Sequence, residues 1–340
     1  MIQSLTFAAA AALAVLTASP SLAADAAQPT GLHVTARIPG PDGGGDLAAF
    51  DPARRRIYVT HATSLIAIDV DTGKANLNFA AGDHLHGVAA VPGTDLIVTS
   101  NSGDNTARII SAVDGKVLAS IPTAKDADGV QYDPATGLVV VICADGGALT
   151  LIDPKAMKAV ATIDLGTPLE FGAPDGKGRF FVNLEDKNAV AVVDLVARKV
   201  LAQYPLPGCQ RPTGLAYVAG DRVISDCGNG GVDILDGASG RAIATFTVGG
   251  FPDAVIYDDQ RQLAFVPSAM SGALTVIALS GKGDNTIVDT VPTQLGARTG
   301  AVDPKTGRLY LPTAEYVLPA PAGQRPSTKP GTFNILVLDR

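Results

Sequence analysis

The chain has 340 residues and a formal net charge of −7, with 37 glycines and 23 prolines. An acidic chain without a basic stripe is poorly suited to a phosphate backbone, which needs clustered Lys and Arg, so we expect no nucleic-acid partner. The glycines and prolines suit a fold with many turns. No window beyond the first twenty residues sustains an amphipathic helical period, so the sequence predicts an all-β protein.

Residues 1–24 are predicted to be an export signal. Leu5–Leu16 is an apolar run that is too short to span a bilayer, and Ser21 and Ala23 supply the small residues that a signal peptidase requires. The residues before this run carry no Lys or Arg, so an uncleaved membrane anchor remains the alternative. Cleavage would leave a mature chain without a membrane span in the periplasm or outside the cell.

A repeated unit follows, and its pattern is clearest in Ile57–Lys74. Ile57–His61 and Leu65–Val70 read as strands, and the Asp-Thr-Gly turn after them leads into a further strand. The closing strand of each unit ends about 42 residues after the preceding one, at Ile38, Ala80, Pro122, Asp164, Leu206, Val248 and Pro292. A period near forty residues with four short strands is typical of a β-propeller blade.

The two ends of the chain complete each other. Leu32–Pro39 is a lone strand before the first full unit, and Phe333–Asp339 is the third strand of a last unit that lacks its fourth. Pairing them closes the ring and hides two exposed strand edges. The sequence therefore predicts one domain over residues 31–340, a seven-bladed β-propeller closed by its N-terminal strand, and we expect a monomer.

The unit that begins at Tyr58-Val59-Thr60-His61 and continues through Ile68-Asp69 and Thr72-Gly73-Lys74 resembles the YVTN repeat of YncE-like seven-bladed propellers, a family of exported bacterial proteins. His61 stands where the family motif has Asn. The resemblance covers the whole mature chain and implies the fold. For function it implies binding or scaffolding only. Single-stranded DNA binding, linked to one branch of the family, is disfavoured here by the acidic charge and the lack of interleaved aromatic and basic residues.

Connections from the fourth strand of one blade to the first strand of the next rim the channel of a propeller. Aligning the units on their first strands places one residue of each blade at this rim: Asp46, His86, Asp128, Glu170, Thr213, Asp253 and Arg298. His84 and Arg211 stand two residues before their rim residues. A rim with four carboxylates, one His and one Arg suggests a site for a small-molecule or protein ligand.

Three interpretations of this rim remain open. Asp46, Asp128, Glu170 and Asp253 could hold Ca²⁺ or another divalent cation, because hard cations prefer oxygen ligands. His86 and Glu170 could perform acid–base work while Arg211 and Arg298 grip a substrate carboxylate. The third interpretation is a solvated channel mouth with internal salt bridges.

His84 and His86 could also chelate a transition metal. Alternation along an extended segment would send both imidazoles to the same side, where Asp83 or His61 could supply a third ligand. No established zinc motif accompanies the pair, and a His-x-His in a loop is more often a feature of the surface.

Cys209 and Cys227 are predicted to form a disulfide. If Gly214–Tyr217 pairs antiparallel with Val223–Asp226, both cysteines fall on the same face within bridging range. An exported protein favours the bridge. Cys143 is expected to be a buried free thiol.

The last unit carries a Pro-rich insertion over residues 315–332, between its second and third strands. We expect it to form a flap on the channel face. For the whole protein, the first hypothesis is a non-catalytic binding propeller. The alternative is an enzyme similar to the lactonase-like propellers, which include cofactor-independent cycloisomerases. It would act on lactones or organic acids through His86, Glu170, Arg211 and Arg298.

Overall fold

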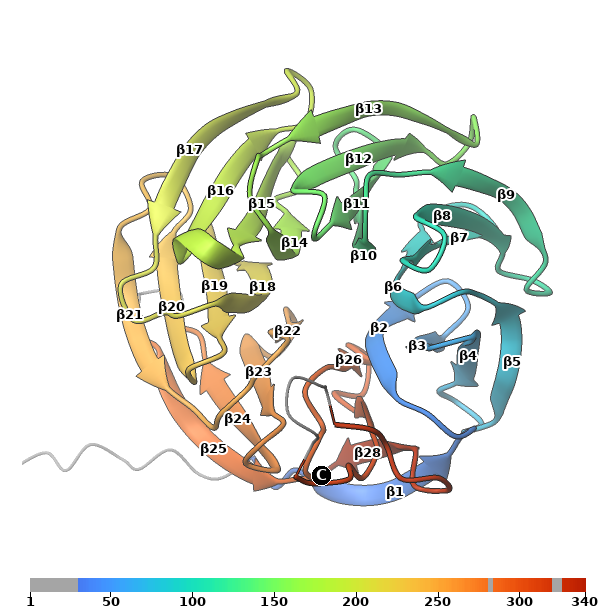
Figure 1. The fold of residues 1–340 in the computed structure, drawn as a ribbon. Helices are drawn as coiled ribbons and strands as arrows, with labels where there is room; N and C mark the ends of the chain where they lie inside the picture. Colours follow the sequence, from blue (N-terminus) through green and yellow to red (C-terminus); the bar gives the residue numbers. More distant parts are fainter. Residues whose placement is uncertain (1–29, 281–283, 320–325) are drawn as a thin grey trace, which may run out of the picture.

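The computed structural model describes residues 30–280, 284–319 and 326–340. Over these ranges the chain forms a ring of seven four-stranded antiparallel sheets, one per blade, as the 42-residue period predicts (Figure 1). Within them the helical structure is confined to one 3₁₀ turn, Glu185–Lys187. The same part of the chain contains no helix with the length and apolarity needed to cross a bilayer. The predicted export signal, residues 1–24, lies outside the described residues.

Blades 1 to 6 each use four consecutive strands, ordered from the channel outward. Blade 1 contains β2 (Gly45–Asp51), β3 (Arg56–His61), β4 (Ser64–Asp69) and β5 (Ala75–Ala81). Blade 2 contains β6 (Leu85–Val91), β7 (Leu96–Asn101), β8 (Thr106–Ser111) and β9 (Val117–Pro122). Blade 3 contains β10 (Ala127–Asp133), β11 (Leu138–Cys143), β12 (Ala148–Asp153) and β13 (Lys158–Asp164).

The next three blades repeat this arrangement. Blade 4 contains β14 (Leu169–Pro174), β15 (Arg179–Leu184), β16 (Ala189–Asp194) and β17 (Lys199–Pro205). Blade 5 contains β18 (Pro212–Val218), β19 (Arg222–Cys227), β20 (Gly231–Asp236) and β21 (Ala242–Thr247). Blade 6 contains β22 (Ile256–Asp258), β23 (Leu263–Ser268), β24 (Ala273–Ala278) and β25 (Thr286–Pro292).

Blade 7 joins the two ends of the chain. Its strands are β26 (Ala301–Val302), β27 (Leu309–Thr313), β28 (Asn334–Asp339) and, outermost, β1 (His33–Pro39). β1 pairs antiparallel with β28 from His33 opposite Asp339 to Pro39 opposite Asn334. The backbone N–H and the hydroxyl of Thr30 both donate to the Asp289 carboxylate of blade 6, at 2.8 and 2.5 Å. The predicted closure of the ring by an N-terminal strand is therefore confirmed.

The core lies between the blades, because the middle strands are apolar on both faces. In β3, Ile57 and Val59 belong to the apolar cluster shared with blade 7, whereas Tyr58 belongs to the cluster shared with blade 2. Successive side chains of a strand point to opposite faces, so a continuous apolar run serves two interfaces at once. Seven such clusters occupy the seven interfaces of the described ring.

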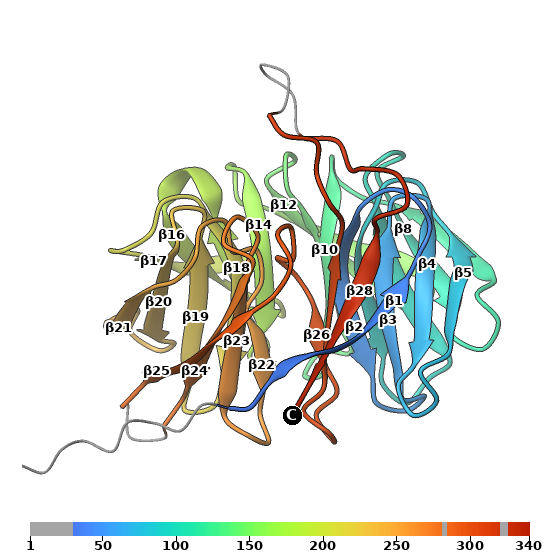
Figure 2. The ribbon, with the colours of Figure 1, turned by 90° about the horizontal axis from the view of Figure 1, so that it is seen from below.

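The connections divide the ring into two faces. Those between blades, and those from the second to the third strand within a blade, lie at the mouth face. The turns from first to second and from third to fourth strand lie at the opposite face. The insertion of blade 7 extends beyond the ring on the mouth side (Figure 2). Its described parts form a short ladder, in which Val317 N–H donates to Ser327 O at 2.8 Å and Lys329 N–H to Glu315 O at 2.7 Å. The middle of the predicted flap, residues 320–325, lies outside the described residues.

The predicted disulfide is present. Cys209 in the loop before β18 is bonded to Cys227 at the end of β19, with a Cα–Cα distance of 5.4 Å. Cys143 is a buried free thiol, as expected.

Candidate functional site at the channel mouth

The rim side chains are positioned by a break in the sheet register that recurs from blade to blade. In blade 2 the pairing of β6 with β7 shifts between Leu85 and Val88, around His86. Equivalent shifts surround Asp46, Asp128, Glu170 and Thr213. A bulge at a sheet end turns one side chain away from the alternating pattern. In these five blades it directs one residue each to the mouth, whereas Asp253 and Arg298 precede the short first strands β22 and β26.

Neighbouring first strands approach closely just below the rim. A Cβ added to Gly87 would lie 2.5 Å from the carbonyl oxygen of Asp128, so only glycine fits there. In blades 1, 2 and 4, a buried polar side chain of the second strand reaches the neighbouring blade at this level. Thr60 donates to the His86 carbonyl at 2.7 Å, and Asn183 to the Thr213 carbonyl at 2.9 Å. Ser100 donates to the Asp128 carbonyl in the same way.

His86 is the centre of the polar network at the rim. Its Nδ1 lies 2.6 Å from Asp46 Oδ2 and 3.7 Å from Asp128 Oδ1, and its Nε2 lies 3.1 Å from the Ser102 hydroxyl oxygen. Burial lowers the pKa of His86, but the hydrogen bond and charge of Asp46 and the charge of Asp128 outweigh it and raise the pKa to about 9. His86 is therefore protonated at neutral pH, and it donates to both Asp46 and Ser102.

Arg298 of blade 7 links two rim carboxylates. Its Nε lies 3.1 Å from Asp253 Oδ2, and one terminal nitrogen lies 3.5 Å from Asp46 Oδ1. The side chain of Arg298 keeps 40% of its surface exposed, against 19% for Asp46 and 27% for Asp253. Arg298 thus sits between carboxylates from blades 6 and 1.

Two carboxylic acids are left in excess of the cations. Glu170 is half-buried, and no hydrogen bond or ion pair to its side chain is found in the described part of the chain. Burial, followed by the charges of Asp128 and Asp253, raises the pKa of Glu170 to about 9. Burial and the charge of Asp46 also raise the pKa of Asp128, against the charge of His86. Without a ligand, Glu170 therefore holds a proton at neutral pH.

Asp226 lies one layer below the rim, at the position in β19 that Thr60, Ser100 and Asn183 hold in their own blades. Its Oδ1 accepts from the hydroxyl of Thr213 and from the backbone N–H of Gly214, both at 2.7 Å. Its Oδ2 is buried and has no partner among the described residues. Burial raises the pKa of Asp226 to about 7, although both hydrogen bonds lower it.

Three of the predicted site residues do not join this cluster. His84 is 73% exposed and points at Asp83, and its φ of +47° places it in the left-handed region. The predicted extended His84–His86 pair is therefore wrong, since β6 begins only at Leu85. Arg211 is 71% exposed and pairs with Glu185 at 2.5 Å. The Thr213 hydroxyl lies within hydrogen-bond distance of Asp226 Oδ1, at 2.7 Å, and of the Pro252 carbonyl oxygen, at 2.9 Å.

The group of possible metal ligands is smaller than the predicted set of four carboxylates. Among the described residues, Asp46, His86 and Asp128 can bring ligand atoms within 4.8 Å of one another, whereas Glu170 and Asp253 lie outside this group. Ca²⁺ prefers six to eight oxygen ligands, and here a protonated imidazole already lies between the two carboxylates. The group therefore does not supply the oxygen ligands that Ca²⁺ prefers.

Three residues of the site were missed by sequence reasoning. Asp226 could have been found by aligning the second strands, because the equivalent buried positions of blades 1, 2 and 4 are also polar. Glu185 belongs to the 3₁₀ turn Glu185–Lys187, which interrupts the repeat of blade 4. Ser102 lies in the turn after β7 and carries no signal in the repeat.

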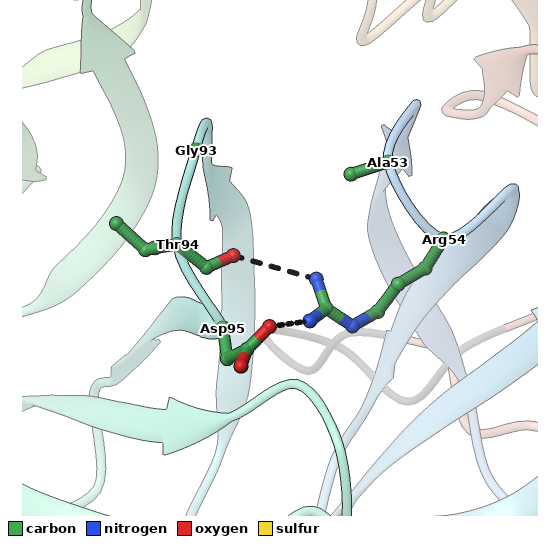
Figure 3. Close-up of a pocket in the computed structure, with 5 residues that line it drawn as sticks. All are labelled: Ala53, Arg54, Gly93, Thr94 and Asp95. Carbon is green, nitrogen blue, oxygen red and sulfur yellow. Dashed lines mark hydrogen bonds and ion pairs between the residues drawn. The ribbon is translucent and has the colours of Figure 1, made fainter.

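The face opposite the mouth has a pocket of its own. An open pocket of about 280 Å³ lies between the first turns of blades 1 and 2, where Arg54 contacts the Thr94 carbonyl and the Asp95 carboxylate (Figure 3). It is far from the ionisable cluster because it lies at the other end of the strands. Its one arginine is already paired, so we assign it no role.

Comparison with known proteins supports the fold alone. No protein-family model matches the chain, and no curated protein matches it. Many solved structures are similar in shape, including the following three. A chain of a mitotic checkpoint complex has a TM-score of 0.71 at 12% identity, with 100% of this chain and 99% of that chain covered. The structure of U3-55K has a TM-score of 0.77 at 11% identity, covering 92% of this chain and 100% of the other. A chain of Kuenenia stuttgartiensis hydrazine synthase has a TM-score of 0.69 at 16% identity, covering 83% and 95%. The chain is thus a seven-bladed β-propeller, and the resemblance to YncE-like proteins is not supported by a family match.

Proposed function

We propose that this protein is an exported, YncE-like binding propeller that recognises a positively charged group of a small molecule or protein partner at its channel mouth. The observation that carries the proposal is Glu170, a half-buried carboxyl group with no hydrogen bond or ion pair in the described ring, facing the charges of Asp128 and Asp253. Within the cluster at the mouth, four carboxylic acids face two cations, His86 and Arg298. The charge of the exposed Arg211, which pairs with Glu185, also acts on Glu170. A cationic ligand would complete the charge balance.

The raised pKa values follow from burial and from the charges of the protein itself. Carboxyl groups crowded at low dielectric take up protons because their anions repel one another and lose hydration. A ligand cation supplies the missing positive charge directly, so its binding should release protons from Glu170 and Asp128. Affinity for a cation should therefore increase as the pH rises towards 9.

Export is supported by two features. The apolar run at the N-terminus is typical of a signal peptide, and the Cys209–Cys227 disulfide is typical of an oxidising compartment. The periplasm or the cell exterior meets both conditions. We also propose that the protein acts as a monomer, because the ring closes within one chain.

The test uses defined probes. Acetyl-arginine amide, spermidine and Ca²⁺, with citrate as the anionic control, are titrated against the whole protein while its thermal unfolding is followed. A ligand that binds only the folded state stabilises it by about 2.7 kcal/mol at a hundred times its Kd. We expect the organic cations to raise the Tm and citrate to leave it unchanged.

Glu170→Gln should reduce the effect of the organic cations. Asp114→Asn serves as the matched control, since Asp114 is an exposed carboxylate in the β8–β9 turn at the opposite face. Stabilisation by citrate but not by the cations would overturn the proposal. So would equal stabilisation of wild type and Glu170→Gln.

The alternative function, a lactonase-like hydrolase, is favoured by one observation. Ser102, His86 and Asp46 form a chain of hydrogen bonds, at 3.1 and 2.6 Å, with the order of roles known from serine hydrolases. In such a reaction the Ser102 oxygen would attack the ester carbonyl while His86 takes the serine proton. His86 would then return that proton to the departing alcohol, and water would release the acyl group.

The protonation of His86 argues against this alternative at neutral pH, because an imidazolium cannot accept the serine proton. Any such activity should increase with pH up to about 9, as His86 loses its proton. Hydrolysis of lactones and of p-nitrophenyl acetate measures it. A rate that rises with pH and vanishes in both Ser102→Ala and His86→Ala would favour the hydrolase. A rate unchanged by Ser102→Ala would remove it.

A further inference from the structure

Three large apolar side chains are exposed on adjacent mouth-face loops of blades 6 and 7. They are Phe251, Met270 and Leu295, with 54%, 68% and 58% of their surface accessible. We call this group the apolar platform. Phe251 precedes the first strand of blade 6, Met270 lies in its β23–β24 turn, and Leu295 follows β25. Exposed apolar side chains are common singly, but a contiguous group next to a polar site is typical of an interaction surface.

Backbone hydrogen bonds hold the three loops together. Ala269 N–H donates to the Phe251 carbonyl at 3.0 Å, and Met270 N–H donates to the Gly250 carbonyl at 3.1 Å. Gly296 N–H, in the third loop, donates to the Ala269 carbonyl at 2.8 Å. The platform is therefore a preformed surface and needs no folding of loops on binding.

Neither the backbone nor the packing explains a phenylalanine at position 251. Its φ is +55°, in the left-handed region that bulky side chains rarely adopt. The fold imposes this conformation, because His84, Asp126 and Arg211 hold the same place in other blades with similar φ values. A phenylalanine with a strained backbone and a side chain that is more than half exposed contributes little to stability, which points to a role in binding.

The platform adjoins the acidic mouth. Phe251 is two residues from Asp253, and Leu295 is three residues from Arg298, which pairs with Asp253 at 3.1 Å. The insertion extends the apolar surface on the same side of the ring, with Val317 46% and Leu318 69% exposed. Next to them, the Tyr316 ring lies against Gly296, where an added Cβ would come within 2.5 Å of it.

We propose that the partner is a protein segment that places a lysine or arginine in the mouth and packs neighbouring apolar side chains on the platform. This inference rests on the proposed function and specifies its ligand. The charge of the mouth selects the basic residue. The open platform selects a protein segment over a small molecule, because small molecules bind mostly in enclosed pockets, whereas protein interfaces use exposed apolar anchors.

Selection from a random peptide library displayed on phage tests the inference with the whole protein as bait. We expect enrichment of peptides with one basic residue flanked by apolar residues. Enrichment of basic residues without apolar neighbours would overturn the platform but leave the proposed function intact. If neither basic nor apolar residues are enriched, both the platform and the proposed function are overturned.

Matched variants then locate the binding with an enriched, fluorescently labelled peptide. Met270→Glu and Phe251→Ser should each weaken binding by about tenfold, as expected for an interface anchor. Val196→Glu is the control, because Val196 is 75% exposed in the β16–β17 turn of the opposite face. It should change the affinity less than about twofold, since a surface contact outside the interface contributes little. Equal affinity for Met270→Glu, Phe251→Ser and Val196→Glu would contradict the proposal. Circular dichroism confirms that each variant is folded.

Discussion

The two faces of the ring use the same residue types in opposite ways. At the opposite face, aspartates at the ends of first strands accept hydrogen bonds from the turns that follow. Asp258 accepts from the backbone N–H groups of Gln260 and Arg261 and pairs with the Arg261 side chain at 2.9 Å. At the mouth, first strands begin with carboxyl groups that face one another. Glu170 there has no hydrogen bond or ion pair within the described residues.

The electrostatic consequence has opposite sign at the two ends. Hydrogen bonds from Arg55 lower the pKa of Asp71. Burial raises the pKa of Asp303, but hydrogen bonds from Arg55 and Thr306 lower it overall. Carboxylates there are stabilised as anions. At the mouth the pKa of Glu170 is raised to about 9, so its anion is destabilised. This difference is the reason we propose the mouth as the functional end.

The largest expected effect comes from breaking a pair at the opposite face. Arg55 binds Asp303 with two hydrogen bonds of 2.8 Å, and the Asp303 side chain is 1% exposed. Arg55→Ala should cost about 3 kcal/mol of unfolding free energy, because it leaves a buried charge unpaired. Urea unfolding at pH 7 measures this. Arg298→Ala at the mouth should cost clearly less, since Asp253 and Asp46 reach solvent and Asp46 keeps His86. Equal losses would remove the distinction between the faces.

A smaller effect is expected at Asp226, beneath the mouth. The folded-state pKa of Asp226 is about 7, above the usual 3.8, so the folded protein holds this proton more tightly than the unfolded chain does. The stability that the proton supplies at low pH is lost as pH rises through about 7. Asp226→Asn keeps an acceptor for Gly214 and adds a permanent donor for blade 6, like Asn183 in blade 4. It should unfold at higher urea than wild type at pH 8.

Asp226→Ala leaves the Gly214 N–H and the Thr213 hydroxyl without their shared acceptor, and should cost about 1–3 kcal/mol. A wild-type stability that is unaffected by pH between 5 and 8, together with an unstable Asn variant, would show that Asp226 is ionised in the fold.

The smallest expected effect on stability is that of Glu170→Gln, and it depends on pH. The folded-state pKa of Glu170 is raised to about 9, so the stability it provides at pH 4 declines as pH rises through 9. The amide cannot ionise. The variant should therefore match wild type near pH 4 and become more stable by about 1 kcal/mol in alkaline solution, a modest amount because the group is partly solvated. Thermal unfolding from pH 4 to 10 checks the sign of the difference.

The sequence predicted the ring and the rim for the same reason. Because every blade follows a period of about 42 residues, the first-strand residue that faces the channel can be located by counting along the sequence. His86, Asp128 and Glu170 were found in this way. Side-chain contacts between blades cannot be located by counting along the repeat. The pairing of Arg211 with Glu185 depends on a 3₁₀ turn that breaks the repeat of blade 4. His84 was misplaced because its left-handed backbone ends the alternation of side chains before β6 begins.

The ring closure described above also bears on the order in which the molecule can fold. His33 pairs with Asp339 across almost the whole chain, whereas the other six blades are assembled from neighbouring strands. Chain closure over such a distance is slow, and contacts of long sequence separation form late. During synthesis β1 must wait for β28, which follows all the other strands of the ring, with its edge unpaired and able to join another chain. Folding yield, more than stability, should therefore depend on whatever shields His33–Pro39 until the circle is complete.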